Sequence, residues 1–62
     1  MKRTIRGLRL DLGLTRVQFA KKLGIAVSTL IRYEQFKQLP DVVTALKIAK
    51  ISNTNIDEIR FK

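Results

Sequence analysis

The chain of 62 residues contains no cysteine and no histidine. Without cysteine it can form no disulfide, and without either residue it lacks the usual ligands of a zinc site. The three glycines form no phosphate-binding motif, and a chain this short encloses little of a substrate pocket. Asp57 and Glu58 are adjacent carboxylates, but charges at a helix start explain them better than catalysis does. We therefore expect no enzyme, no metal and no cofactor.

Long apolar runs are also missing. The first residues, MKRTIRGLRLDLG, contain no signal-peptide core, and no other stretch is long enough to span a bilayer. We therefore expect a cytoplasmic protein with no membrane partner.

Acidic residues are few: five stand against 13 lysines and arginines, which gives a net charge of +8. The imbalance lies in residues 1–38, which hold nine of the basic residues and two of the acidic ones. A basic half on a small domain favours a polyanionic partner, most often nucleic acid, although a solvated surface would look the same. The basic residues are spread over several short segments, which argues against a membrane-surface helix, and few aromatic residues are available to stack on RNA bases.

Residues 1–62 are expected to form a single small domain, near the lower size limit for a stable core. Apolar residues recur at helical spacing along the chain, which predicts an all-α fold of five short helices. The first helix is predicted from about residue 2 or 4 to residue 12, with Ile5, Leu8 and Leu12 on its apolar side.

The second and third helices are predicted to lie almost directly after one another. The second covers about residues 15–24, where Thr15 and Gln18 have capping-box spacing and Gly24 is a C-terminal stop. The third covers about residues 27–35. So short a connection fixes the angle between two helices, which is typical of a helix-turn-helix arrangement.

Two further helices are predicted in the C-terminal part of the chain. Asp41, after Pro40, caps the fourth helix, and Asn55 with Glu58 has the spacing of a second capping box at the start of the fifth. The apolar stripe of the fourth helix is predicted to contain Val42, Ala45, Leu46, Ile48 and Ala49, and that of the fifth Ile56 and Ile59.

The third helix has two different sides. Leu30 and Tyr33 share the side that we expect to face the core. The opposite side carries Ser28, Arg32, Gln35, Val27 and Ile31. An arginine can donate two hydrogen bonds to guanine, a glutamine can pair with adenine, and aliphatic groups can contact the thymine methyl. A solvated surface helix is the alternative, but two apolar residues on the exposed side favour DNA recognition.

These segments resemble a known family. The stretch GLTRVQFAKKLGIAVSTLIRYE, with Leu8-Arg9 before it and Pro40 and Ile56-Asp57-Glu58-Ile59 after it, is similar to the Cro/CI-type (XRE-type) helix-turn-helix repressors of phages and bacteria. The resemblance covers about residues 5–59. It implies a compact five-helix, lambda-repressor-like domain that binds a partly palindromic DNA operator as a homodimer, at least on DNA.

The resemblance, together with the two-sided third helix, assigns roles to individual residues. Base contacts fall on Val27, Ser28, Ile31 and Arg32, with Ala26 at the mouth of the helix. DNA-backbone contacts fall on Thr15, Arg16, Gln35, Lys37 and Gln38. Arg9 and Glu34 correspond to a structural ion pair between the first and third helices. Ile51 and Phe61 are expected to be exposed near a thin C-terminal core and to contribute to a dimer surface.

The chain departs from the family pattern at a few positions. Ala26 stands where a helix-capping Ser or Thr is usual, and Phe36 stands where a glycine commonly adopts a left-handed turn. Ser52 and Thr54 replace apolar residues. The sequence nevertheless predicts a small transcriptional regulator, a Cro-like repressor from a phage or mobile element. The alternative is an antitoxin of a toxin–antitoxin pair, or another protein-docking subunit.

Overall fold

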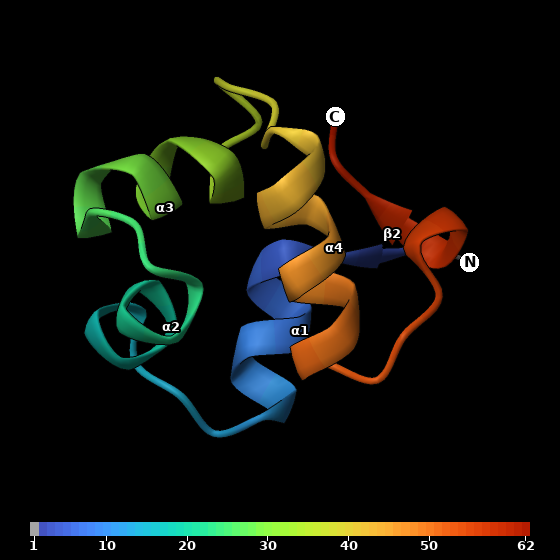
Figure 1. Ribbon diagram of the computed structural model, residues 1–62, viewed down its shortest axis with the longest axis horizontal. Helices are drawn as coiled ribbons and strands as arrows, with labels where there is room; N and C mark the ends of the chain where they lie inside the picture. The colour runs from blue at the N-terminus through green and yellow to red at the C-terminus, as the bar shows by residue number, and fades with distance from the viewer. Residues whose placement is uncertain (1) are drawn as a thin grey trace.

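The computed structural model describes residues 2–62 and contains four α-helices, a 3-10 turn and a short pair of parallel strands (Figure 1). In chain order the elements are β1 (Arg3–Thr4), α1 (Ile5–Asp11), α2 (Arg16–Leu23), α3 (Val27–Glu34), α4 (Val42–Ile51), η1 (Ile56–Glu58) and β2 (Ile59–Arg60). Figure 1 shows α2 and α3 at one side of the molecule and the strands at the other. None of the helices in residues 2–62 has the length and apolar character needed to cross a membrane.

Side-chain caps explain where most of the helices begin. The capping box predicted for α2 is formed: the Gln18 N–H donates to Thr15 Oγ1 at 3.1 Å, and the Thr15 N–H donates to Gln18 Oε1 at 2.9 Å. Asp41 caps α4 as predicted, since its Oδ1 accepts the Thr44 N–H at 2.7 Å. By contrast, Ala26 makes no side-chain cap at the start of α3.

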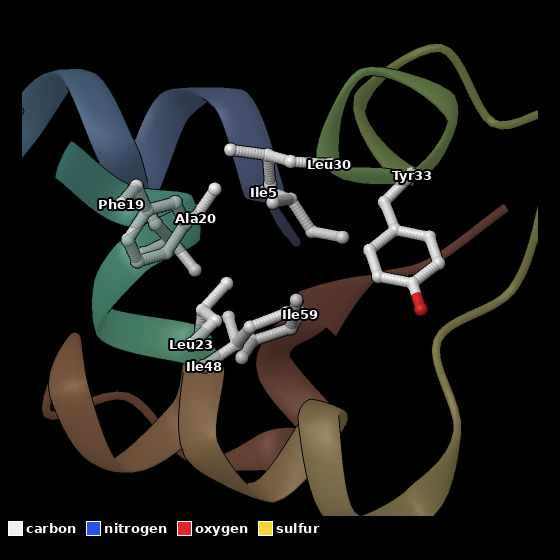
Figure 2. Packing of buried hydrophobic residues seen from close by; sticks show 9 residues of the cluster. Ile5, Phe19, Ala20, Leu23, Leu30, Tyr33, Ile48 and Ile59 are labelled. Carbon is white, nitrogen blue, oxygen red and sulfur yellow. The ribbon is translucent and has the colours of Figure 1, made fainter. Parts of the chain in front are cut away.

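The core draws on five elements, and Figure 2 shows most of its side chains converging from separate segments of the chain. Its fully buried centre includes Phe19 of α2, Leu30 of α3 and Ile48 of α4. The other members of the core are Ile5, Leu8, Ala20, Leu23, Tyr33 and Ile59. Because α2 and α3 both contribute side chains to this core, their relative orientation is held by packing as well as by the short connection between them.

The C-terminal segment differs from the prediction. The fifth helix is only the 3-10 turn η1, after which the chain extends so that Ile59 pairs with Arg3 in parallel register. The Asn55 side chain accepts no hydrogen bond from the backbone, and its Nδ2 donates to the Glu58 side chain at 3.4 Å, so the second capping box is not formed. The extended backbone buries Ile59 while it satisfies strand hydrogen bonds. The fold is therefore mostly helical, with four α-helices where five were expected.

The apolar sides of α1 and α4 also differ in part from the prediction. Leu12 lies beyond the end of α1 and is exposed. The inner side of α4 is formed by Thr44, Ala45 and Ile48. The polar Thr44 is buried there, so the helix is rotated relative to the predicted stripe.

This rotation changes which apolar residues of the C-terminal part are exposed. Val42 is 73% exposed and Leu46 is 53% exposed, although both were predicted to face inward. Ile51 and Phe61, predicted to be exposed, are half-buried and pack against the core. Part of each side chain expected at the dimer surface is thus engaged in contacts within the chain.

Candidate nucleic-acid interface

The connection between α2 and α3 is a tight turn through a left-handed glycine. Gly24 has φ 72°, and the Ile25 N–H donates to the Ala20 carbonyl at 3.0 Å. Ile25 is half-buried and packs against the core. Only glycine adopts this conformation without a steric cost, so the turn places α3 at a fixed angle to α2.

The two sides predicted for α3 are present in the structure. Leu30, Tyr33 and Glu34 are buried, while Ser28, Arg32 and Gln35 are exposed. Val27 and Ile31 are half-buried along one edge, less exposed than the sequence suggested. In Figure 1, α3 lies at the outer edge of the molecule. The helix therefore presents a polar strip with an apolar border to solvent.

A buried carboxylate fixes the inner side of α3 to the two preceding helices. Arg9 Nε donates to Glu34 Oε2 at 2.7 Å and Arg9 Nη2 donates to Glu34 Oε1 at 3.3 Å, so the expected ion pair is bidentate. The Glu34 side chain is 2% exposed, and Arg9 Nη1 also donates to the Leu14 carbonyl at 3.0 Å. A buried pair with its hydrogen bonds satisfied is costly to break, so it locks α3 in register with α1.

The same carboxylate holds a second arginine. Arg16 Nε donates to Glu34 Oε1 at 3.2 Å, while the Arg16 side chain remains 44% exposed. Arg16 is the first residue of α2 and follows the Thr15 cap. Glu34 thus anchors a partly exposed cation at the N-terminus of α2, where an anion would be favoured.

Arg32, in the middle of the exposed strip, is held by side chains from two directions. Its Nε donates to Gln38 Oε1 at 2.9 Å, and its Nη2 donates to Thr29 Oγ1 at 3.3 Å. Gln38 was expected to contact the DNA backbone and Thr29 was given no role. The structure brings both of them onto Arg32. A contact between residues six positions apart across a loop follows no helical spacing, so the sequence offered no signal for it.

The loop after α3 keeps the left-handed turn that the family usually gives to glycine. Phe36 occupies it with φ 59°. Such a conformation costs a residue with a Cβ about 1–2 kcal/mol. The guanidinium carbon of Arg60 lies 5.0 Å from the centre of the Phe36 ring, a cation–π contact that offsets part of this cost. The strained turn is therefore tied to strand β2.

The remaining predicted backbone contacts surround the same strip. Lys37 and Gln35 are exposed at the C-terminal end of α3. Thr15 is exposed at the opposite end of the site, and its oxygen already accepts the cap hydrogen bond, which leaves the hydroxyl proton free to donate. In residues 2–62, no group of three or more acidic residues has an arrangement that could hold a metal ion.

Comparison with known proteins agrees with this geometry. The helix-turn-helix family matches residues 5–59. An uncharacterised HTH-type transcriptional regulator of Archaeoglobus fulgidus is 34% identical over 59 residues, which cover 95% of this chain and 84% of that protein. Another, from Methanocaldococcus jannaschii, is 37% identical over 59 residues and is covered over 89% of its length. No solved structure matches the chain significantly.

Proposed function

Because the chain belongs to the helix-turn-helix family of DNA-binding transcriptional regulators, we propose that it represses transcription by occupying a specific double-stranded DNA site. The observation that carries this proposal is the outer strip of α3, in which Ser28, Arg32 and Gln35 are exposed on a helix whose inner side is locked into the core. An α-helix fits the major groove, where each base pair presents a distinct pattern of donors and acceptors.

Base recognition is assigned to the strip and its apolar border. Arg32 has enough donors to bind guanine O6 and N7, and Ser28 can donate to or accept from a neighbouring base. Val27 and Ile31, half-buried at the edge of the strip, suit the thymine methyl. With Ala26 making no side-chain cap, the backbone N–H groups at the start of α3 are free of a competing side-chain acceptor.

Phosphate contacts are assigned to the two ends of the site. Thr15 and Arg16 lie at the N-terminus of α2, and Gln35, Lys37 and Gln38 lie at or after the end of α3. Arg16 is the best supported of these, since Glu34 holds its guanidinium in place while nearly half of the side chain stays exposed. These contacts set orientation and carry no sequence information directly.

The proposed active form is a homodimer on a partly palindromic operator. Two copies would place their α3 helices in successive major grooves, about 34 Å apart, and would obstruct polymerase. The protein would then act in the cytoplasm as a Cro-like repressor of a phage or mobile element, controlled by its own concentration or by a competitor for the site. Ile51 and Phe61 can contribute only through their half-exposed parts.

A second function, docking to another protein as an antitoxin does, is favoured by one observation. The outer side of α4 exposes Val42, Val43 and Leu46, each more than half accessible. Adjacent exposed apolar residues are typical of interaction surfaces. A protein that co-purifies with the wild-type chain and is lost in a Val42→Glu/Leu46→Glu variant would support this function.

Fluorescence anisotropy tests the main proposal. The DNA upstream of the protein's own gene is compared with a scrambled duplex of the same length, from about 50 to 200 mM salt. We expect a preference of about a thousandfold that survives the higher salt. Lys37→Ala is the matched control: it should weaken both duplexes alike and lower the salt slope by about one. Equal and steeply salt-dependent binding of both duplexes by the wild type would refute sequence-specific regulation.

A further inference from the structure

The hydrogen bonds of Arg32 within the protein use some of the N–H donors of its guanidinium and leave the others for a ligand. A guanidinium has five N–H donors, and two of them are used here, one on Nε toward Gln38 and one on Nη2 toward Thr29. The remaining three lie on the two terminal nitrogens. Guanine requires two of them, side by side, for O6 and N7. The contacts inside the protein thus leave a sufficient set of donors for one base.

Gln38 also comes from a segment whose position is fixed. The Lys37 N–H donates to the Arg32 carbonyl at 2.9 Å, so the loop binds the backbone of the same residue whose side chain Gln38 holds. The Phe36 N–H donates to the Tyr33 carbonyl at 3.2 Å, and the Phe36 ring lies under Arg60. A tethered partner loses less conformational freedom when its side chain forms a hydrogen bond, so the contact to Arg32 is favoured.

We propose that Gln38 and Thr29 are positioning residues that orient the Arg32 guanidinium for guanine, so that base preference is set partly by the loop after α3. This inference rests on the proposed function. A free arginine samples many rotamers, and only those with two donors in the plane of the base discriminate guanine from adenine. Holding Nε and one N–H of Nη2 restricts the orientations that the guanidinium can adopt. Supporting residues that restrict rotamers in this way raise specificity by pre-organisation.

A different role for Gln38 makes a different prediction. As a phosphate contact alone, Gln38 would donate from its amide nitrogen and would affect all DNA sequences equally. As a positioning residue, it would affect chiefly the base pair that Arg32 reads. Gln38→Glu keeps the acceptor oxygen, and its added negative charge should weaken binding to every duplex without changing the preference for guanine.

The first part of the test needs no DNA. In ¹⁵N-labelled wild-type protein, the exchange of the Arg32 Nε–H with water is measured by NMR, alongside Gln38→Ala, Gln38→Glu and the control Lys50→Ala, at an exposed residue of α4 outside the proposed interface. We expect slower exchange for Arg32 than for an exposed arginine such as Arg6. Exchange should be faster in Gln38→Ala, equal or slower in Gln38→Glu because a carboxylate is the stronger acceptor, and unchanged in the control. An unprotected Nε–H in the wild type would overturn the inference.

The second part measures base preference with the same variants. Each binds the operator and a copy in which the guanine contacted by Arg32 is replaced by adenine. Gln38→Ala should lose about three- to tenfold of the wild-type preference, the equivalent of one hydrogen bond, while Gln38→Glu and the control Lys50→Ala keep it. Equal losses by Gln38→Ala on both duplexes would overturn the positioning role but leave the proposed function standing. A wild type that prefers no sequence would overturn both.

Discussion

The buried carboxylate of Glu34 gives the sharpest stability prediction. Glu34→Gln keeps the shape of the side chain but removes the charge opposite Arg9, whose side chain is only 8% exposed. Removing one partner of a buried ion pair costs about 3–5 kcal/mol. The Leu14 carbonyl still accepts from Arg9, so we expect the lower end, about 3 kcal/mol. A domain of this length has about 3–9 kcal/mol of total stability, so the variant should retain about 0–6 kcal/mol at 25 °C.

Urea denaturation followed by circular dichroism measures this loss, and two control variants identify its cause. Arg16→Ala removes the partly exposed arginine from the same carboxylate and should cost about 0–1 kcal/mol, because solvent screens that pair. The double variant Arg9→Met/Glu34→Leu should be more stable than Glu34→Gln, since it leaves no unpaired buried charge. The reasoning fails if Glu34→Gln lies within 1 kcal/mol of the wild type, or if Arg16→Ala is equally destabilising.

Other predictions concern the helix ends. Ala26→Ser should raise the free energy of unfolding by about 1 kcal/mol, because α3 has no side-chain cap, and an unchanged urea midpoint would contradict this. Gly24→Ala should cost about 1–2 kcal/mol through backbone strain alone, since a Cβ there meets nothing closer than 3.9 Å; a loss below about 0.5 kcal/mol would show that the turn can relax. Two hydrogen bonds from Thr44, the larger effect from its side chain and the smaller from its backbone N–H, hold the pKa of Asp41 below its ordinary value of 3.8. Because the folded pKa is the lower one, the stability from this cap is present above the unfolded pKa and is lost as pH falls through the folded pKa. The unfolding midpoint of the wild type should therefore fall more steeply below pH 3.8 than that of Asp41→Asn, and parallel curves would contradict the assignment.

Features that depend on neighbouring residues were predictable from the sequence. The α2 capping box, the Asp41 cap and the Gly24 stop each depend on a few adjacent positions, and all three are present. The inner and outer sides of α3 follow from helical geometry, because its buried positions include Leu30 and Tyr33. Local chemistry was sufficient for these caps and for the two sides of α3.

Features that depend on distant contacts were not predictable. Ile59 has helical spacing from Ile56, but pairing with Arg3 at the other end of the chain extends its backbone. The predicted apolar stripe of α4 did not include the polar Thr44, which is buried in the structure and marks the rotation of the helix. The Arg32–Gln38 contact depends on the path of a loop whose left-handed residue is Phe36. Each error arose where tertiary packing overrides a local preference.

The central claim is that the exposed strip of α3 reads a DNA sequence through Arg32. Its most direct test is the selection of binding sites from a pool of random duplexes by the wild type and by Arg32→Ala. The wild type should enrich one motif that contains an invariant guanine, and Arg32→Ala should enrich the same motif with only that position lost, at a cost of about 1–3 kcal/mol. If the wild type enriches no motif, or if Arg32→Ala still selects the guanine, α3 does not read DNA in this way.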